Sequence, residues 1–299
     1  MSEIDILSFG ETMAMFVADH NGDLANVDHF HKRIAGADSN VAIGLSRLGF
    51  KVAWLSRVGG DSLGRFVVDT LQKEGLDCRH VDIDPAHPTG FQLKSRTDDG
   101  DDPRVEYFRR GSAASFLAPQ SIVAELLGAR HLHATGIVPA LSDSARQMSF
   151  ELMTRMREAG RSVSFDPNLR PSLWASERQM ITEINRLAAL AHWVLPGLSE
   201  GRLLTGFEDP ADIAAFYLDQ GAEAVPIRGD RSVAFGWYSC VPDWLWPLCC
   251  WPCNCSLWRW AAQPAGRACC CVRFTCWRRR QPGSHRLRTK FGCHAAGLG

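Results

Sequence analysis

Hydrophobic positions in the first 230 residues alternate between a spacing typical of strands and one typical of helices. Short apolar runs that end at Gly, such as 5–10 and 51–59, predict strands. Longer segments with apolar residues three and four apart, such as 39–49, predict helices, and there Val41, Leu45 and Leu48 fall on one face. Strands separated by helices of this length predict an α/β fold with a mostly parallel central sheet.

The alternation extends to about residue 222. Glycines that follow the periodic segments mark helix ends, Gly49 being the first. Further strands are expected at 80–85, 131–138, 162–168 and 192–197, and further helices at 62–75, 120–129, 144–160, 178–191 and 210–222.

Two segments lack helical periodicity, one at about 12–35 and one at about 88–112. Both show extended alternation around polar turns, which predicts β-hairpins. Hairpins from two separate places can form one small β-sheet lid. Because open parallel sheets bind ligands at the carboxyl ends of their strands, such a lid would close a site there.

The net charge of zero hides a sharp division along the chain. Residues 231–299 hold ten of the 33 basic side chains and one of the 33 acidic ones, so residues 1–230 are acidic and the tail is basic. A mildly acidic body suits a cytoplasmic enzyme and gives no reason to expect nucleic acid. We also find no signal peptide and no apolar stretch of the ~18–20 residues that a bilayer requires, so no membrane partner is expected.

The tail, 231–299, has neither strand nor helix periodicity. It contains ten cysteines, whereas Cys78 alone precedes it, as in a protein of a reducing compartment. A zinc site, a disulfide scaffold, a basic nucleic-acid module and translation in a wrong reading frame are the alternatives. The last explains the composition and the lost periodicity together and is favoured. The zinc alternative would draw on Cys250, Cys253 and Cys255 with His285, Cys293 or His294.

Two stretches of the first half could bind a ligand. Gly36 and Ala37 leave the backbone bare before a helix, and Asp38, Ser39 and Asn40 place short polar side chains at its start. The alternative is an ordinary helix that Ser39 or Asn40 caps. Tyr107 and Arg109 are expected on one side of a strand, where an aromatic hydroxyl beside a guanidinium suits a carboxylate or a polyol. A solvated strand face is the alternative there.

Polar residues also follow two later strands. Asp166, Asn168 and Arg170 come at the carboxyl end of one strand, where active-site groups collect in this fold class, although capping is the alternative. Glu200 begins a helix after the next strand. Its carboxylate could favour the helix dipole or reach Mg²⁺, directly or through water.

Several stretches resemble the PfkB/ribokinase family of carbohydrate kinases, more narrowly the 2-dehydro-3-deoxygluconokinases (KDG kinases). They occur in family order and cover roughly residues 4–230: "SFGETMAMF", "GADSNVAIGLSRLG", "RVGGDSLGR", "EYFRRGSAAS", "FDPNLRPSLW" and "EGRLLTG". The resemblance implies a ribokinase-like three-layer sandwich with a β lid. It also implies ATP-dependent, Mg²⁺-assisted phosphorylation of a sugar-acid hydroxyl.

By this resemblance, the sugar acid would bind at Gly36, Ala37, Asp38, Ser39, Asn40, Gln92, Tyr107, Arg109 and Arg170. Arg170 would also stabilise the phosphate, Asn168 would lie towards the nucleotide, and Glu200 would serve Mg²⁺. The family's Asn-x-x-Glu motif has Gly197 in place of Asn in this chain. The Gly-Ala-Gly-Asp motif that supplies the family's catalytic base is absent from the chain.

These observations predict a carbohydrate kinase body in residues 1–230 and an aberrant tail in 231–299, where the family completes the nucleotide site. The expected substrate is 2-dehydro-3-deoxy-D-gluconate (KDG), and the chain itself is expected to be inactive. A fructokinase or ribokinase-type sugar kinase and a non-catalytic sugar-acid binding protein are the alternatives. The resemblance also implies a homo-oligomer formed through the lid.

Overall fold

The computed structural model describes residues 4–97, 102–229, 234–238, 273–275 and 290–291. The chain divides into two compact units. The first contains residues 1–163 and 170–176, and the second contains 164–169 and 177–299. Each unit is described by itself below.

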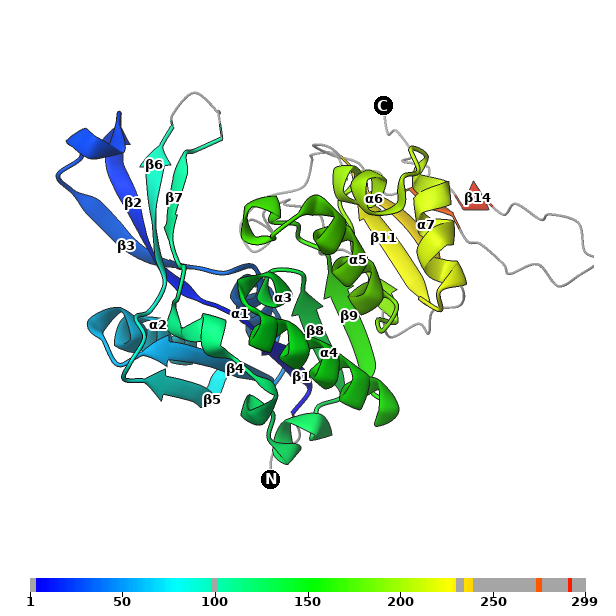
Figure 1. Ribbon diagram of the computed structural model, residues 1–299, viewed down its shortest axis with the longest axis horizontal. Helices are drawn as coiled ribbons and strands as arrows, with labels where there is room; N and C mark the ends of the chain where they lie inside the picture. The colour runs from blue at the N-terminus through cyan, green and yellow to red at the C-terminus, as the bar shows by residue number, and fades with distance from the viewer. Residues whose placement is uncertain (1–3, 98–101, 230–233, 239–272, 276–289, 292–299) are drawn as a thin grey trace, which may run out of the picture. The chain divides into compact units, whose positions relative to one another are not determined.

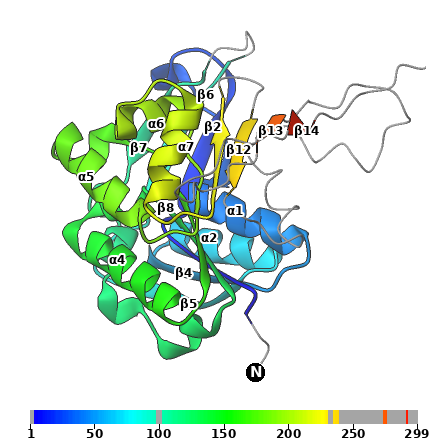
Figure 2. The same ribbon diagram turned by 90° about the vertical axis from the view of Figure 1, so that its right-hand side faces the viewer.

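The first unit is built on parallel strands in the order β8-β1-β4-β5. Figure 2 shows α1 and α2 on one face of these strands and α4 on the other, so the unit has three layers. Strands β1, β4 and β8 are buried on both faces, as the unexposed side chains of Leu7 and Trp54 illustrate, whereas the edge strand β5 is partly exposed. Their bounds are β1 Ile6–Phe9, β4 Val52–Gly59, β5 Asp77–Asp84 and β8 His131–Thr135, and the helices are α1 Ala37–Arg47, α2 Ser62–Lys73, α3 Val138–Leu141 and α4 Asp143–Glu158.

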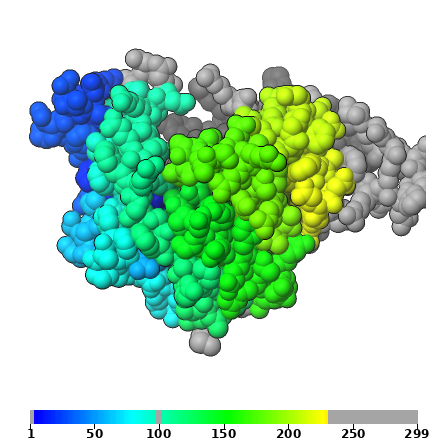
Figure 3. Space-filling model, in the orientation of Figure 1, coloured from blue at the N-terminus to red at the C-terminus, as the bar shows by residue number. Residues whose placement is uncertain are grey.

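A small four-stranded sheet extends from the layers of the first unit (Figure 1). Its order is β3-β2-β6-β7, with β2 (Met13–Asn21) and β3 (Phe30–Ala35) as one hairpin and β6 (Phe91–Arg96) and β7 (Val105–Phe108) as the other. The hairpins join through parallel pairing of β2 with β6. The predicted small sheet is therefore confirmed. In the space-filling view its residues, in dark blue and blue-green, project above those of α2 and β5 (Figure 3).

Helix α2 illustrates how local signals produce this arrangement. Asp61 caps the helix by accepting a hydrogen bond from the Gly64 N–H at 2.7 Å. Val67 and Leu71, four residues apart, are both unexposed, which matches the predicted apolar face. The chain leaves the helix through Gly75, whose φ of +85° favours glycine.

Two local predictions are wrong, the place of Leu48 on the apolar face of the first helix and the α-helix at 120–129. Helix α1 begins at Ala37, and Leu48 lies just past its end and is 58% exposed. Segment 120–129 is not an α-helix but lies in the short 3-10 helices Pro119–Ser121 and Ala124–Gly128. Its buried apolar residues, Ile122, Leu126 and Ala129, are spaced as in a helix, so the periodicity alone did not distinguish an α-helix from two 3-10 turns.

In the second unit the strands follow the order β14-β13-β12-β11-β10-β9. Strands β9, β10 and β11 are parallel, whereas β12 runs antiparallel to β11. Helices α6 and α7 pack against β11, as Figure 1 shows. The bounds are β9 Ser162–Asp166, β10 Trp193–Val194, β11 Ala224–Arg228, β12 Ala234–Tyr238, β13 Arg273–Thr275, β14 Lys290–Phe291, α5 Glu177–Ala188, α6 Leu198–Thr205 and α7 Pro210–Asp219.

The zinc alternative falls outside the described residues, which include none of its cysteines or histidines. Within the described residues, no group of three or more His, Cys, Asp and Glu side chains could hold a metal ion. Cys78 is free and buried, and burial raises the pKa of its thiol to about 11. No helix in the described part is long and apolar enough to cross a bilayer.

Candidate functional site

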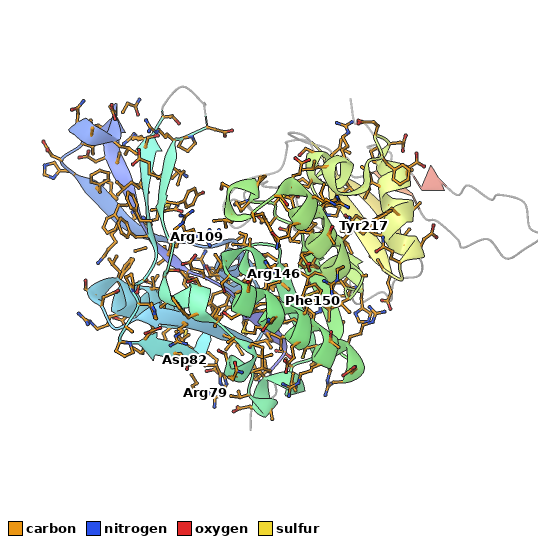
Figure 4. The ribbon with its side chains drawn as sticks, viewed as in Figure 1. Arg79, Asp82, Arg109, Arg146, Phe150 and Tyr217 are labelled. Carbon is orange, nitrogen blue, oxygen red and sulfur yellow. The ribbon has the colours of Figure 1, made fainter. Side chains whose placement is uncertain are left out.

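Arg109 lies at the root of the small sheet, where the chain leaves β7 (Figure 4). Its Nη2 atom forms an ion pair with Glu11 Oε2 at 2.5 Å. Arg109 is 8% exposed and Glu11 is 4% exposed, so the pair is buried. Glu11 lies between β1 and β2, just before the first strand of the small sheet, and Arg109 follows β7, the last strand of that sheet along the chain. The ion pair therefore links the two segments through which the chain enters and leaves the small sheet. A solvated strand face is therefore wrong for Arg109.

The second carboxylate oxygen of Glu11 is also occupied. Ser112 Oγ donates a hydrogen bond to Glu11 Oε1 at 2.5 Å. A Cβ atom at Gly90 would lie 2.5 Å from the same oxygen, so only glycine leaves room for the carboxylate there. Glu11 is thus held between the residue that precedes β6 and the turn that follows β7.

Two predicted sugar-binding residues are brought together in the small sheet. Gln92 on β6 is directly opposite Tyr107 on β7, and residues in this position have side chains on the same face. Gln92 is 6% exposed, whereas Tyr107 is 53% exposed. The solvated-face alternative therefore describes Tyr107 but not the neighbouring Arg109, which lies past the end of the strand.

The segment Gly36–Asn40 forms the beginning of α1. Gly36 is the N-cap residue, and no side chain caps the helix, so the alternative that Ser39 or Asn40 does so is wrong. Asp38 and Ser39 are buried, and Ser39 Oγ donates to the Gly36 carbonyl oxygen at 3.2 Å. Asn40 is exposed. The buried polar residues therefore face the interior at the helix start.

The glycine-rich stretch 57–65 anchors the small sheet. Asp61 accepts a hydrogen bond from the Thr89 N–H at 2.8 Å, and Thr89 Oγ1 accepts one from the Gly59 N–H at 2.9 Å. A Cβ at Gly64 would overlap the Gly59 carbonyl oxygen. The glycines thus permit close backbone approach, which ties α2 to the residues that precede β6.

Arg170 belongs to the first unit, on the loop 170–176. Its carbonyl oxygen accepts a hydrogen bond from the Leu173 N–H at 3.0 Å. The indole of Trp174 is buried, and the Arg146 guanidinium of α4 lies 5.6 Å from its ring centre. This contact fixes the loop that carries Arg170 to the first unit.

Glu200, in the first turn of α6, accepts two backbone hydrogen bonds in the second unit. Its Oε2 accepts from the Gly197 N–H and its Oε1 from the Leu169 N–H, both at 2.8 Å. The carboxylate therefore caps its own helix and fixes the end of the loop that follows β9.

Asp166 ends β9 and is held by Asn168. The backbone N–H of Asn168 donates to Asp166 Oδ1 at 3.1 Å and its side-chain amide donates to Oδ2 at 3.2 Å. Asn168 has a φ of 38°, a left-handed conformation that Asn adopts more readily than most residues. Burial, and then the negative charge of Glu200, raise the pKa of Asp166 to about 6.

These two carboxylates fit a magnesium ion. Mg²⁺ prefers oxygen ligands and is commonly held by one or two carboxylates together with water and substrate phosphates. A cation would offset the repulsion between Asp166 and Glu200 that contributes to the raised pKa of Asp166. Because both Glu200 oxygens already accept backbone N–H groups, a contact through water is compatible with the geometry.

Two residues of these arrangements, Glu11 and Ser112, were not predicted from the sequence, and Asp166 was expected at its strand end without a specific role. Glu11 lies just past the carboxyl end of β1, and that position was the available signal. Nothing local in the sequence singles out Ser112, because its partner Glu11 is 101 positions away.

Comparison with known proteins agrees with this architecture. The profile of the pfkB family of carbohydrate kinases matches residues 3–231. A 2-dehydro-3-deoxygluconokinase of Bacillus subtilis (strain 168) is 47% identical over 235 residues, which cover 78% of this chain and 72% of the relative. The crystal structure of a PfkB protein from Polaromonas sp. JS666 matches with a TM-score of 0.76 at 50% identity, over 78% of this chain and 79% of that one.

A putative ribokinase II from E. coli, solved in complex with ATP and Mg²⁺, has the same fold at 21% identity, with a TM-score of 0.71 over 79% of this chain and 76% of that one. The fold is therefore ribokinase-like, with a mostly parallel α/β core and a small β-sheet. The match at residues 3–231 places this chain in the pfkB family of carbohydrate kinases. The predicted family and fold class are confirmed.

Proposed function

We propose that the first unit binds a sugar acid, with KDG as the substrate. The buried guanidinium of Arg109 carries this proposal, because a fixed positive charge favours a carboxylate-bearing ligand over a neutral sugar. The 47% identity to a 2-dehydro-3-deoxygluconokinase supports the same substrate. Gly36, Ala37, Asp38, Ser39, Asn40, Gln92, Tyr107 and Arg170 would complete the sugar site.

We propose that the second unit contributes to binding of ATP and Mg²⁺. Asn168 would lie towards the nucleotide, and Glu200 would hold Mg²⁺, directly or through water, with Asp166 beside it. Mg²⁺ supplies neutralisation of phosphate charge when it is bound. Arg170 would stabilise the transferred phosphate from the substrate side.

The family reaction requires a base. In KDG phosphorylation the 6-hydroxyl oxygen forms a bond to the γ-phosphorus of ATP, the bond from that phosphorus to ADP breaks, and the hydroxyl proton passes to the base. The chain contains no Gly-Ala-Gly-Asp sequence, and its match to the family profile ends at residue 231. We therefore propose that this chain retains the sugar-acid site and does not catalyse the transfer.

We further propose that residues 1–230 are the carbohydrate kinase body and that 231–299 are translated in a different frame. The loss of acidic residues, of periodicity and of the family match at the same position supports this division. Residence in the cytoplasm, which the acidic body and the scarcity of cysteine before residue 231 support, belongs to the same proposal. So does a homo-oligomer formed through the small sheet, which the family resemblance supports.

Titration calorimetry with the full chain tests the substrate assignment. We expect heat of binding with KDG and at least tenfold weaker binding with fructose. Tighter binding of fructose would favour a fructokinase or ribokinase-type site and contradict the assignment. Equal affinity for KDG and for a neutral analogue without the carboxylate would show that the Arg109 guanidinium does not favour an acidic ligand.

A further inference from the structure

Glu11 lies where the connections to the small sheet meet. It follows β1 and precedes β2, and its carboxylate contacts Arg109 and Ser112, which follow β7. On the other side, Gly90 immediately precedes β6. This buried carboxylate, itself on the connection from β1 to β2, thus lies against two further connections between the small sheet and the layers of the first unit.

The contact with Arg109 fixes one edge of the guanidinium. Nη2 is 2.5 Å from Glu11 Oε2, and Arg109 is 8% exposed, so the side chain has little freedom to turn. Its Nε atom is buried and has no hydrogen-bond partner among the residues that the structure describes. A guanidinium has five N–H donors in a planar fork, so the charged group keeps donors beyond the one directed at Glu11.

The other oxygen of Glu11 makes this orientation hard to change. Ser112 Oγ holds Oε1 at 2.5 Å, and the bare backbone of Gly90 leaves no room for a bulkier residue beside it. Rotation of the carboxylate towards another partner would leave the Ser112 hydroxyl or the Arg109 guanidinium without its acceptor. A buried donor or charge without a partner costs free energy.

We propose that Glu11 is a positioning residue that determines specificity for an acidic sugar. It holds the Arg109 guanidinium in one orientation, so that the remaining N–H donors meet the carboxylate of the ligand. This inference rests on the proposed sugar-acid site. Glu11 does not contact the reacting atoms; it acts through Arg109.

Binding of KDG to Glu11→Gln in the full chain, measured by titration calorimetry, tests this. Gln keeps the size of the side chain but removes the charge that pairs with Arg109. We expect KDG binding to weaken at least tenfold and fructose binding to change less than threefold. Glu11→Asp, which keeps the charge at a shorter reach, should bind KDG with intermediate affinity.

Glu74→Gln is the matched control, because Glu74 pairs with Arg47 at 2.6 Å away from the small sheet. It should leave KDG binding unchanged.

Unchanged or tighter KDG binding by Glu11→Gln would overturn the proposal, and tighter binding would mean that Glu11 competes with the ligand for Arg109. If Glu11→Gln fails to fold, Glu11→Asp decides: affinity equal to the unsubstituted chain overturns the proposal. Failure of the unsubstituted chain to bind KDG would contradict the proposed function instead.

Discussion

Burial of a guanidinium is costly unless a negative group is its partner, and Arg109 is only 8% exposed. Arg109 must therefore face negative groups, and Glu11 supplies one. At the scale of single residues, the proposed discrimination between an acidic and a neutral sugar rests on this fixed charge. Asp166 is the corresponding residue in the second unit, where a carboxyl group is held beside another carboxylate.

Arg109→Ala should weaken KDG binding by about 10- to 100-fold, the effect of losing a charge-assisted hydrogen bond. The affinity of Arg109→Ala for fructose should change little. Arg109→Lys, which keeps the charge but not the planar fork, should bind KDG with intermediate affinity. Titration calorimetry measures the affinities of the unsubstituted chain and of both variants. Circular dichroism of each variant checks the fold, because Arg109→Ala leaves Glu11 without its ion partner. KDG binding indifferent to Arg109→Ala would contradict the acid assignment.

Asp166 should make stability depend on pH. Its pKa of about 6 in the folded chain is above the value of an unfolded aspartate, so its stabilising contribution is full below about pH 4 and lost as the pH rises through 6. Urea unfolding of the unsubstituted chain and Asp166→Asn at pH 4.5 and 7.5 measures this. The variant should gain relative stability at the higher pH. A stability difference that does not vary with pH would contradict a raised pKa at Asp166.

At the scale of elements, close backbone contacts decide which residues the turns accept. The glycine-rich stretch before α2 lies against the residues that lead into β6, and Gly59 and Gly64 leave no space for a Cβ. The hydrogen bonds of Asp61 and Gly59 with Thr89 hold the start of β6 in place. The arrangement of the small sheet thus depends on this turn.

Gly64→Ala should lower the free energy of unfolding by about 1–3 kcal/mol, because its Cβ would overlap the Gly59 carbonyl oxygen. Gly128→Ala is the matched control, since nothing lies within 4 Å of a Cβ there. It should change stability by less than about 0.5 kcal/mol. Urea unfolding of both variants measures the difference, and equal stability would show that the turn relaxes without cost.

The sequence predicted the elements whose signals are local. Strand β4 and helix α2 follow their apolar periodicity, and the two hairpins follow alternation around polar turns. It failed at 120–129, where apolar residues with helical spacing form 3-10 turns. It also could not find the Glu11–Arg109 pair, because these residues meet only when both ends of the small sheet are assembled.

At the scale of the whole molecule, the chain changes character at about residue 231. The family profile ends there, and beyond it the chain has one acidic residue, Asp243, and ten cysteines. The family's base would come from this part of the chain. On the proposed function, sugar-acid binding and phosphate transfer are therefore separate properties of this chain, and each can be measured alone.

Reading codons 220–299 of the coding sequence in all three frames tests the origin of the tail. We expect another frame to encode a periodic segment with a Gly-Ala-Gly-Asp motif. That result would also separate a kinase that has lost its base from a binding protein that never had one. No family-like segment in either alternative frame would contradict the frame-change explanation.

Turnover tests the central claim most directly. The full chain, shown by calorimetry to bind KDG, would be assayed with ATP and Mg²⁺ by coupling ADP release to an observable oxidation of a nicotinamide cofactor. The account predicts that KDG causes no ADP release above the rate without protein, because no base accepts the hydroxyl proton. ADP release that depends on KDG and rises with protein concentration would contradict it.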